Sequence, residues 1–252
     1  MSSTGESSSA VAVEDLTKAY GDTVALRDVS LSVAPGEFVS VVGHSGCGKS
    51  TLLRVLAGLE DDFRGTATVD GTDVRTEGGH RVGMVFQEPR LLPWKTVREN
   101  VAVGLPRDVD PDSEAARERV DALLDRVGLS GFEDARPSEL SGGMAQRVSL
   151  ARGLAYDPTV MLLDEPFSAL DALTKYEQQD FLLDLWRDSD LTVVLVTHDV
   201  EEAAYLSDRV VVLGGQPGTV ETTVDIGEGR PRDREEWLVP YRDRITTALG
   251  VE

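Results

Sequence analysis

The chain has 252 residues, 40% of them hydrophobic, enough for one large domain or two closely packed subdomains. Its formal net charge is −20, because 45 acidic residues outnumber 25 basic ones, and this surplus argues against nucleic acid as a partner. Only four of the basic residues are lysine, and an acid-rich, lysine-poor surface is typical of proteins that stay soluble in high salt; an ordinary acidic protein is the alternative.

Residues 1–10 (MSSTGESSSA) have neither the basic start nor the apolar core of a signal peptide, and we interpret them as a disordered tail. Cys47 is the single cysteine, which excludes an intrachain disulfide and fits a reducing cytosol. No apolar run approaches the roughly 18 residues needed to span a membrane. The chain is therefore expected to be soluble, or attached to a membrane only through something else.

Strand and helix patterns alternate through most of the chain. Residues 11–36 and 65–75 carry short alternating runs, with a hairpin signal at Asp70–Gly71, and predict a small antiparallel sheet. Near-continuous apolar runs, typical of strands buried on both faces, occupy residues 37–42, 81–86, 159–164 and 192–198. Because helical patterns lie between them, at 50–59 and 172–188 for example, we predict an α/β core with a parallel sheet.

An all-helical insertion between two core strands is predicted over residues 96–155. Within residues 113–128 one apolar stripe has helical spacing, and Gly128 suits the helix end. The stripe consists of Ala116, Val120, Leu123, Leu124 and Val127. After about residue 215 the chain has more glycine, proline and charge, which predicts a strand or two and a short terminal helix, to which we assign no chemistry.

Residues 43–50 (GHSGCGKS) match the phosphate-loop pattern G-x-x-x-x-G-K-[ST], between an apolar strand and a helix; a chance glycine-rich turn is the alternative. Gly43, Gly46 and Gly48 should let the backbone turn so that its N–H groups surround a phosphate, and the helix adds its positive end. His44 and Cys47 occupy variable positions and are interpreted as spacers. The predicted nucleotide-binding residues here are Gly43, His44, Ser45, Gly46, Cys47, Gly48, Lys49, Ser50 and Thr51.

Three of these residues have specific expected roles. Lys49 should reach the β- and γ-phosphates of ATP, the Ser50 hydroxyl should ligate Mg²⁺, and Thr51 can donate to the α-phosphate. Asp164 and Glu165 follow a buried strand and should lie at the same sheet edge. We expect Asp164 to hold Mg²⁺ and Glu165 to orient and deprotonate the attacking water, although adjacent acids alone are often only a solvated strand end.

Two further side chains end strands at this edge. His198 ends the strand 192–198 and can donate to the γ-phosphate; a lone histidine is more often structural, but this placement favours function. Gln87 follows the strand 81–86 and can contact both Mg²⁺ and the water. We therefore predict Glu165, His198 and Gln87 as catalytic residues, and Ser50, Gln87 and Asp164 as the metal site.

In this order these residues resemble the ATP-binding subunits of ABC transporters, over about residues 11–214. LSGGMAQR (140–147) is the most specific element, because other P-loop families such as kinases and small GTPases lack LSGG. The resemblance implies a RecA-like P-loop NTPase core with a small antiparallel β subdomain and a helical insertion subdomain. It also implies that SALD (168–171) is the D-loop, ending in Asp171 at the nucleotide, and that Tyr20 stacks on adenine; a plain strand-end tyrosine is the alternative.

Four stretches narrow the resemblance to the nitrate, sulfonate and taurine import branch, although importers of thiamine precursors share much of the pattern. They are residues 87–102, 164–174, 196–213 and 230–232. The branch implies two such subunits on two membrane permease subunits, at the cytoplasmic face of the cell membrane, with an extracytoplasmic protein delivering the solute. A soluble ABC ATPase of the iron–sulfur assembly type and a non-hydrolytic scaffold are the rivals; intact Glu165 and His198 argue against the second.

Residues 140–151 (LSGGMAQRVSLA) raise a question of assembly. Ser141 can cap the helix that follows, while Gly142 and Gly143 leave its first N–H groups uncovered, which makes an anion site. A single nucleotide hardly needs two phosphate-binding sites, this one and residues 43–51, from the same chain. We therefore predict that Ser141, Gly142 and Gly143 hold the γ-phosphate bound by a second copy, in a head-to-tail dimer; the alternative is a simple capped helix.

The apolar stretch LLPW (91–94) has two interpretations, which can both hold. It can form a groove that receives a short helix of the membrane subunit, or it can belong to the core of the helical insertion. Because it lies just after Gln87, occupancy of the γ-phosphate site could alter the docking surface. We therefore hypothesise that coupling to transport runs through this segment.

Overall fold

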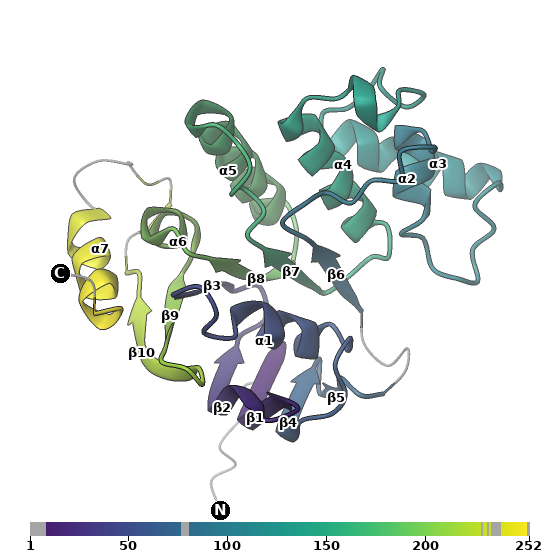
Figure 1. The fold of residues 1–252 in the computed structure, drawn as a ribbon. Coiled ribbons are helices and arrows are strands. Elements are labelled where there is room, and N and C mark those ends of the chain that lie inside the picture. The colour runs from purple at the N-terminus through teal and green to yellow at the C-terminus, as the bar shows by residue number, and fades with distance from the viewer. Residues whose placement is uncertain (1–8, 77–80, 228, 231, 233–237, 251–252) are drawn as a thin grey trace, which may run out of the picture.

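The structure is a computed structural model that describes residues 9–76, 81–227, 229–230, 232 and 238–250. Most of the predicted N-terminal tail, residues 1–8, lies outside this range. Two sheets, the helices that pack on them and a separate helical lobe make up the described residues (Figure 1). None of the helices in these ranges is long and apolar enough to cross a bilayer.

The central sheet has the predicted parallel arrangement, with one antiparallel strand added at an edge. Its strands lie in the order β10-β9-β3-β8-β7-β6. Their bounds are β3 (Phe38–Gly43), β6 (Val82–Val85), β7 (Val160–Asp164), β8 (Thr192–Thr197), β9 (Arg209–Gly214) and β10 (Thr219–Asp225). Every residue of β3 and β8 is buried, because helices or the second sheet cover both faces. The carboxyl ends of β3, β6, β7 and β8 therefore meet at one edge.

The second sheet is antiparallel, as predicted, with the order β2-β1-β4-β5. Its strands are β1 (Val11–Tyr20), β2 (Thr23–Val33), β4 (Arg64–Val69) and β5 (Thr72–Asp73). The expected hairpin turn at Asp70 and Gly71 joins β4 to β5 with φ values of 49° and 73°, which suits a two-residue hairpin loop. Helix α1 (Lys49–Leu56) buries Leu52, Leu53, Val55 and Leu56 in the core that this sheet shares with the central sheet.

The helical insertion lies between β6 and β7 and has a hydrophobic core of its own. It contains α2 (Val97–Ala102), α3 (Glu114–Arg126), a short 3₁₀ helix (Pro137–Glu139) and α4 (Gly142–Leu154). The predicted stripe of α3 faces this core, and Gly128 follows the helix with φ 68°. Because α4 also sends Leu150 and Leu154 into the core of the central sheet, it connects the insertion to that sheet.

Three helices cover the outer face of the central sheet: α5 (Ala172–Arg187), α6 (Val200–Leu206) and α7 (Leu238–Ala248). Leu238 and Ile245 of α7 are buried in the same core as α5 and α6. The tail after residue 215 thus consists of one strand and one helix in its described part, and it packs on the central sheet beside α6 (Figure 1).

Candidate functional site

The loop between β3 and α1 has the backbone of a phosphate loop. Gly46 and Gly48 have φ values of 82° and 95°, a region that favours glycine. Gly43 does not have a positive φ, but a Cβ at this position would lie 2.5 Å from both Cys47 Sγ and Leu213 O. Gly43 therefore serves close packing of the loop on β9, whereas we expected it to serve the turn.

Lys49 is held within this loop. Its Nζ donates to the carbonyl oxygens of Gly43 at 2.7 Å and His44 at 3.0 Å, and the residue is 6% exposed. The first N–H groups of α1 are capped by no side chain at Gly48. An uncapped helix N-terminus beside a lysine is a ready anion site, since its N–H groups and positive dipole end point at the ligand.

The two oxygen ligands predicted for Mg²⁺ lie together. Ser50 Oγ, from α1, donates to Asp164 Oδ1, at the end of β7, at 3.0 Å. Burial raises the pKa of Asp164 above its usual value, against the opposing effect of the Ser50 hydrogen bond. The third predicted ligand, Gln87, has a different hydrogen-bond partner: its Nε2 donates to Ser168 Oγ at 3.2 Å.

The predicted catalytic pair is also in contact. His198 Nδ1 lies 3.0 Å from Glu165 Oε2, with side chains that are 62% and 20% exposed. Glu165 has φ 46°, unusual for a residue with a side chain, and its N–H donates to Val196 O at 2.9 Å. The backbone at the end of β7 is thus tied to β8 in a conformation that directs the carboxylate toward the imidazole.

The start of α4 is the exposed end of the helical insertion. Ser141 caps the helix, as predicted, by accepting from Met144 N–H at 3.3 Å. A Cβ on Gly143 would lie 3.0 Å from Thr174 Cγ2, and one on Gly142 would lie 3.3 Å from Leu170 Cδ2. Gly143 therefore lets α4 approach α5 closely, and Gly142 does the same for the SALD segment that precedes α5, a packing reason that sequence patterns did not reveal.

The remaining predicted nucleotide contacts have partners within the chain. Tyr20 is 42% exposed, its hydroxyl donates to Glu60 Oε1 at 2.9 Å, and Lys18 Nζ lies 4.8 Å from its ring centroid. Asp171 caps α5 by accepting from Thr174 N–H at 3.1 Å. Hydrogen bonds to Thr174 hold the pKa of Asp171 below its usual value, so this carboxylate is charged.

Cys47 and His44, the two residues interpreted as spacers in the phosphate loop, differ in their burial and contacts. Cys47 is buried, and that burial raises the pKa of its thiol, which fits an unreactive packing residue. His44 is exposed, and its Nε2 lies 2.8 Å from the carbonyl oxygen of Leu249, just beyond α7. The C-terminal segment therefore contacts the phosphate loop, a long-range contact with no signal in either local sequence.

Sequence patterns also missed an ion-pair cluster directly after His198. Lys175 of α5 pairs with Asp199 and Glu202, at the start of α6. One signal was available: Lys175 is one of only four lysines in a chain with 25 basic residues, and another of the four, Lys49, lies in the phosphate loop.

Comparison with known proteins agrees with this geometry. The ABC transporter family matches residues 26–168. An aliphatic sulfonates import ATP-binding protein of Xanthomonas axonopodis pv. citri (strain 306) is 52% identical over 229 residues, covering 91% of this chain and 90% of the relative. A protein of the same description from Pseudomonas savastanoi pv. phaseolicola (strain 1448A / Race 6) is 54% identical over 222 residues, 88% of each chain.

Solved structures give the same result. A dimeric bacterial ABC transporter cassette superimposes with a TM-score of 0.75 at 33% identity, covering 87% of this chain and all of that one. A dimeric post-hydrolysis state of an ATP-binding cassette, bound to ADP and Pi, has a TM-score of 0.74 at 33% identity, with the same coverage. This chain belongs to the ABC transporter family, as an ATP-binding subunit with ATPase activity.

Proposed function

We propose that this chain powers an importer of aliphatic sulfonates, and that Lys49, Ser50, Asp164, Glu165 and His198 form its hydrolytic site. One observation carries the site: the Ser50–Asp164 and Glu165–His198 contacts occur at the same sheet edge as the phosphate loop. The solute is inferred from relatives that are 50–54% identical and are described as sulfonate importers. Nitrate, taurine and thiamine precursors, which share the branch pattern, are the competing solutes.

The residues at this edge fit an ATP·Mg²⁺ complex. In the part of the chain that the structure describes, no three His, Cys, Asp or Glu side chains gather as a self-sufficient metal site. Mg²⁺ needs no such cluster, because it is usually held by one or two carboxylates together with phosphate oxygens and water. Ser50 and Asp164 supply hard oxygen donors of that kind, and Gln87 is a third candidate. When bound, the ion neutralises part of the phosphate charge.

Phosphoryl transfer depends mainly on positioning and charge stabilisation. Lys49 exchanges its two carbonyl contacts for the β- and γ-phosphates, and the N–H groups of the loop and of α1 surround them. Glu165 orients a water and accepts its proton while the water oxygen attacks the γ-phosphorus, and the bond to the β,γ-bridging oxygen breaks to release ADP and phosphate. His198 holds the carboxylate through the 3.0 Å contact and donates to the γ-phosphate.

The assembly proposed here is a head-to-tail pair of chains on two permease subunits. Ser141 and Gly142 are exposed, which suits a contact with the nucleotide of a second copy. We place this pair at the cytoplasmic face of the cell membrane, where the permease subunits provide the transmembrane path. A solute-binding protein outside the cytoplasm supplies the solute.

Glu165→Gln tests this function. We expect the variant to bind ATP but to hydrolyse it about 10²- to 10⁴-fold more slowly, since a neutral amide cannot accept the proton of the water. In proteoliposomes that contain the permease and binding protein, the wild-type chain should drive ATP-dependent uptake of an alkanesulfonate, and the variant should not.

Two controls make this test specific. Glu118→Gln removes an exposed carboxylate from α3 and should leave both activities unchanged. Near-normal turnover in Glu165→Gln would remove Glu165 from its role. Uptake that responds to nitrate or to a thiamine precursor, but not to the alkanesulfonate, would refute the proposed solute.

A further inference from the structure

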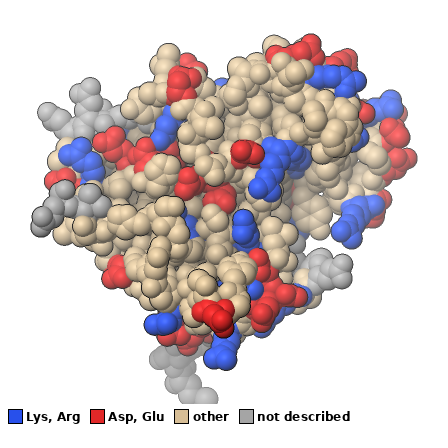
Figure 2. Space-filling view, viewed as in Figure 1, with Lys and Arg blue, Asp and Glu red and all other residues tan. Residues whose placement is uncertain are grey.

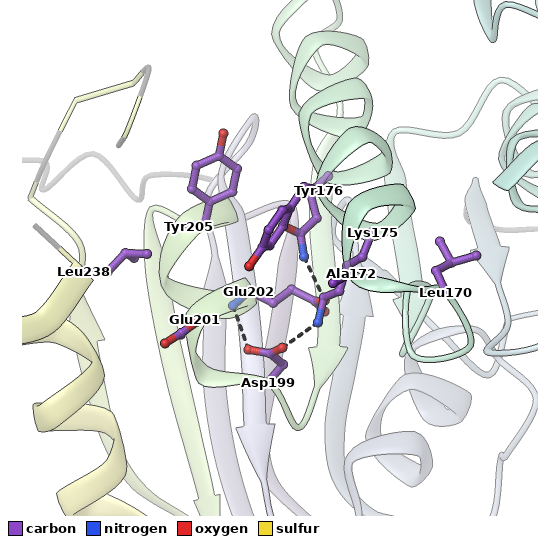
Figure 3. Close-up of a pocket in the computed structure, with 10 residues that line it drawn as sticks. Leu170, Ala172, Lys175, Tyr176, Asp199, Glu201, Glu202, Tyr205 and Leu238 are labelled. Atoms are coloured by element: carbon purple, nitrogen blue, oxygen red, sulfur yellow. Dashed lines mark hydrogen bonds and ion pairs between the residues drawn. The ribbon is translucent and has the colours of Figure 1, made fainter. Parts of the chain in front are cut away.

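A partly buried ion-pair cluster joins α5 to α6. Lys175 Nζ lies 2.5 Å from Asp199 Oδ2 and 3.0 Å from Glu202 Oε2, and Gln179 Nε2 donates to Glu202 Oε2 at 3.1 Å. Figure 3 shows Lys175, Asp199 and Glu202 pointing toward one another at one side of a cavity of about 300 Å³. The Glu202 and Lys175 side chains are only 3% and 18% exposed, so their charges depend on each other, whereas the Asp199 side chain is 36% exposed.

The cluster holds the residue next to the proposed catalytic histidine. Asp199 follows His198 directly, its N–H donates to Thr197 Oγ1 at 3.0 Å, and its Oδ1 caps α6 by accepting from Glu202 N–H at 3.0 Å. Only Oδ2 faces Lys175. Because the cap is made by the other oxygen, the lysine is not needed to start α6. It instead restrains the orientation of Asp199.

The other end of the cluster reaches the segments expected at a dimer interface. Lys175 lies in the first turn of α5, and its N–H donates to Asp171 O at 2.8 Å. The preceding residue, Thr174, is the side chain that Gly143 of α4 approaches closely. A movement of the LSGG helix or of the SALD segment therefore acts on the same helical turn that carries the lysine.

The contacts of the cluster keep Lys175 and Asp199 charged, whereas burial raises the pKa of Glu202 above its usual value in spite of Lys175. Burial alone would lower the pKa of Lys175, but Glu202 and Asp199 outweigh it and raise that pKa. Burial would likewise raise the pKa of Asp199, but the hydrogen bond from Lys175 lowers it overall. Lysine and aspartate thus meet as a cation and an anion, a contact shorter and stronger than a neutral hydrogen bond.

We propose that Lys175 is a positioning residue, which holds His198 against Glu165 through Asp199 and links this contact to the first turn of α5. The inference rests on the proposed roles of His198 and Glu165. Lys175 itself contacts neither residue in any described hydrogen bond or ion pair, so its effect is on geometry. Small displacements of catalytic groups lower the rate of the chemical step, by up to about 10²-fold for about 1 Å.

Lys175→Met tests the proposal, since methionine keeps much of the side-chain length without the charge. We expect kcat for ATP hydrolysis to fall about 10- to 100-fold while KM for ATP stays within about twofold, because the phosphate loop is untouched. Lys175→Arg should restore most of kcat. Asp199→Asn, which keeps an acceptor for the α6 cap but removes the ion pair, should reproduce the loss and covers the case in which Lys175→Met fails to fold.

Two controls separate positioning from general stability. Arg242→Met removes an exposed ion pair between α7 and Glu201, which lies on α6 next to Glu202. This variant should leave kcat unchanged. In a His198→Ala background, Lys175→Met should cause no further loss, because residues that act through one another are not additive. The melting temperature of every variant is measured alongside.

The outcomes are distinguishable. Normal hydrolysis by His198→Ala overturns the proposed site itself. A strong loss in His198→Ala combined with normal kcat in Lys175→Met overturns only the inference about Lys175. The inference also fails if Lys175→Met lowers kcat equally in both backgrounds, or if Lys175→Arg does not restore the rate.

Discussion

Ser141 is the residue at which the two explanations of the LSGG segment diverge. As a helix cap it needs only its bond to Met144 N–H, and the two glycines after it need only the close packing of α4 on α5 and on the SALD segment. As half of a nucleotide site it must also meet a second copy, which suits the exposure of Ser141 and Gly142. The two explanations can be separated by making the same Ser→Arg substitution at the caps of two helices, only one of which is proposed to contact a nucleotide.

Ser141→Arg should retain ATP binding and lose both dimer closure and hydrolysis, because a long side chain would occupy the space of the partner's γ-phosphate. ATP binding is measured by fluorescence titration, closure by light scattering in the Glu165→Gln background, and turnover by phosphate release.

Ser113→Arg is the matched control, since Ser113 caps α3 in the same way, by accepting from Ala116 N–H at 3.2 Å. Both variants lose a cap that contributes about 1 kcal/mol. If Ser141→Arg hydrolyses ATP as fast as Ser113→Arg does, LSGG is only a cap.

Side-chain contacts between residues at recognisable strand ends and loops followed from the sequence, whereas contacts of residues outside such patterns did not. Ser50 and Asp164 could be paired because each lies at the edge defined by a recognisable strand and loop. Arg232 could not be placed, although it is buried and donates to the carbonyl oxygens of Ala204 and Ser207 at the C-terminal end of α6. Residues 230–232 contributed to the family resemblance, but no periodicity indicated what the Arg232 side chain contacts.

At the scale of elements, the same contrast holds. Buried strands and amphipathic helices carry their own patterns, so the parallel sheet, the hairpin at Asp70–Gly71 and the helical insertion were all predictable. The order of strands in the central sheet was not, because it depends on packing between segments far apart. The docking of α7 onto the core likewise depends on Leu238 and Ile245, two buried residues within a weak local pattern.

The two interpretations of the LLPW segment concern different side chains. Leu91 packs on the core of the insertion, whereas Trp94 is 67% exposed. The buried Asn100 fixes the loop between them, since its Oδ1 accepts from Leu92 N–H and its Nδ2 donates to the carbonyls of Leu92, Lys95 and Thr96. Core and docking interpretations therefore apply to different residues of the segment.

This segment is also tied to α4. Arg152, near the end of that helix, donates to the carbonyl oxygens of Pro89 at 2.6 Å and Arg90 at 3.0 Å. Burial lowers the pKa of Arg152, which nevertheless remains a cation at neutral pH. The residues between Gln87 and Trp94 are thus anchored to the helix that begins with LSGG, which supports a coupling role for this part of the chain.

Trp94→Ala should uncouple transport from hydrolysis, because it removes an exposed aromatic side chain from the proposed permease contact and leaves the ATP site intact. Sulfonate uptake in proteoliposomes should fall at least tenfold, the scale expected when an interface anchor is truncated, while basal ATPase activity of the isolated chain is unchanged.

Phe132→Ala is the control, since Phe132 is 42% exposed in the same helical insertion but lies outside the segment. It should spare both activities. Equal loss of uptake and basal ATPase activity in Trp94→Ala would contradict a coupling role.

At the scale of the whole molecule, the charge is the feature that site chemistry does not explain. The chain carries a net charge of −20, and Figure 2 shows acidic side chains over several parts of one face with basic side chains among them. Many basic residues are already paired, as in the contacts of Arg98 with Asp121 and Arg209 with Glu37. The unpaired surplus repels itself and lowers the stability of the folded chain in dilute buffer.

Stability should therefore rise as KCl is increased from 0.1 M toward molar concentrations. The Debye length falls from about 10 Å to about 3 Å over that range, which removes most repulsion between exposed carboxylates. If the acidic surface is an adaptation to high salt, the urea midpoint should continue to rise between 1 and 2 M KCl, where simple screening is nearly complete. Sucrose at matched osmolality is the control for a general effect of excluded solutes. Full stability in dilute buffer, with no gain on adding KCl, would leave an ordinary acidic protein as the explanation.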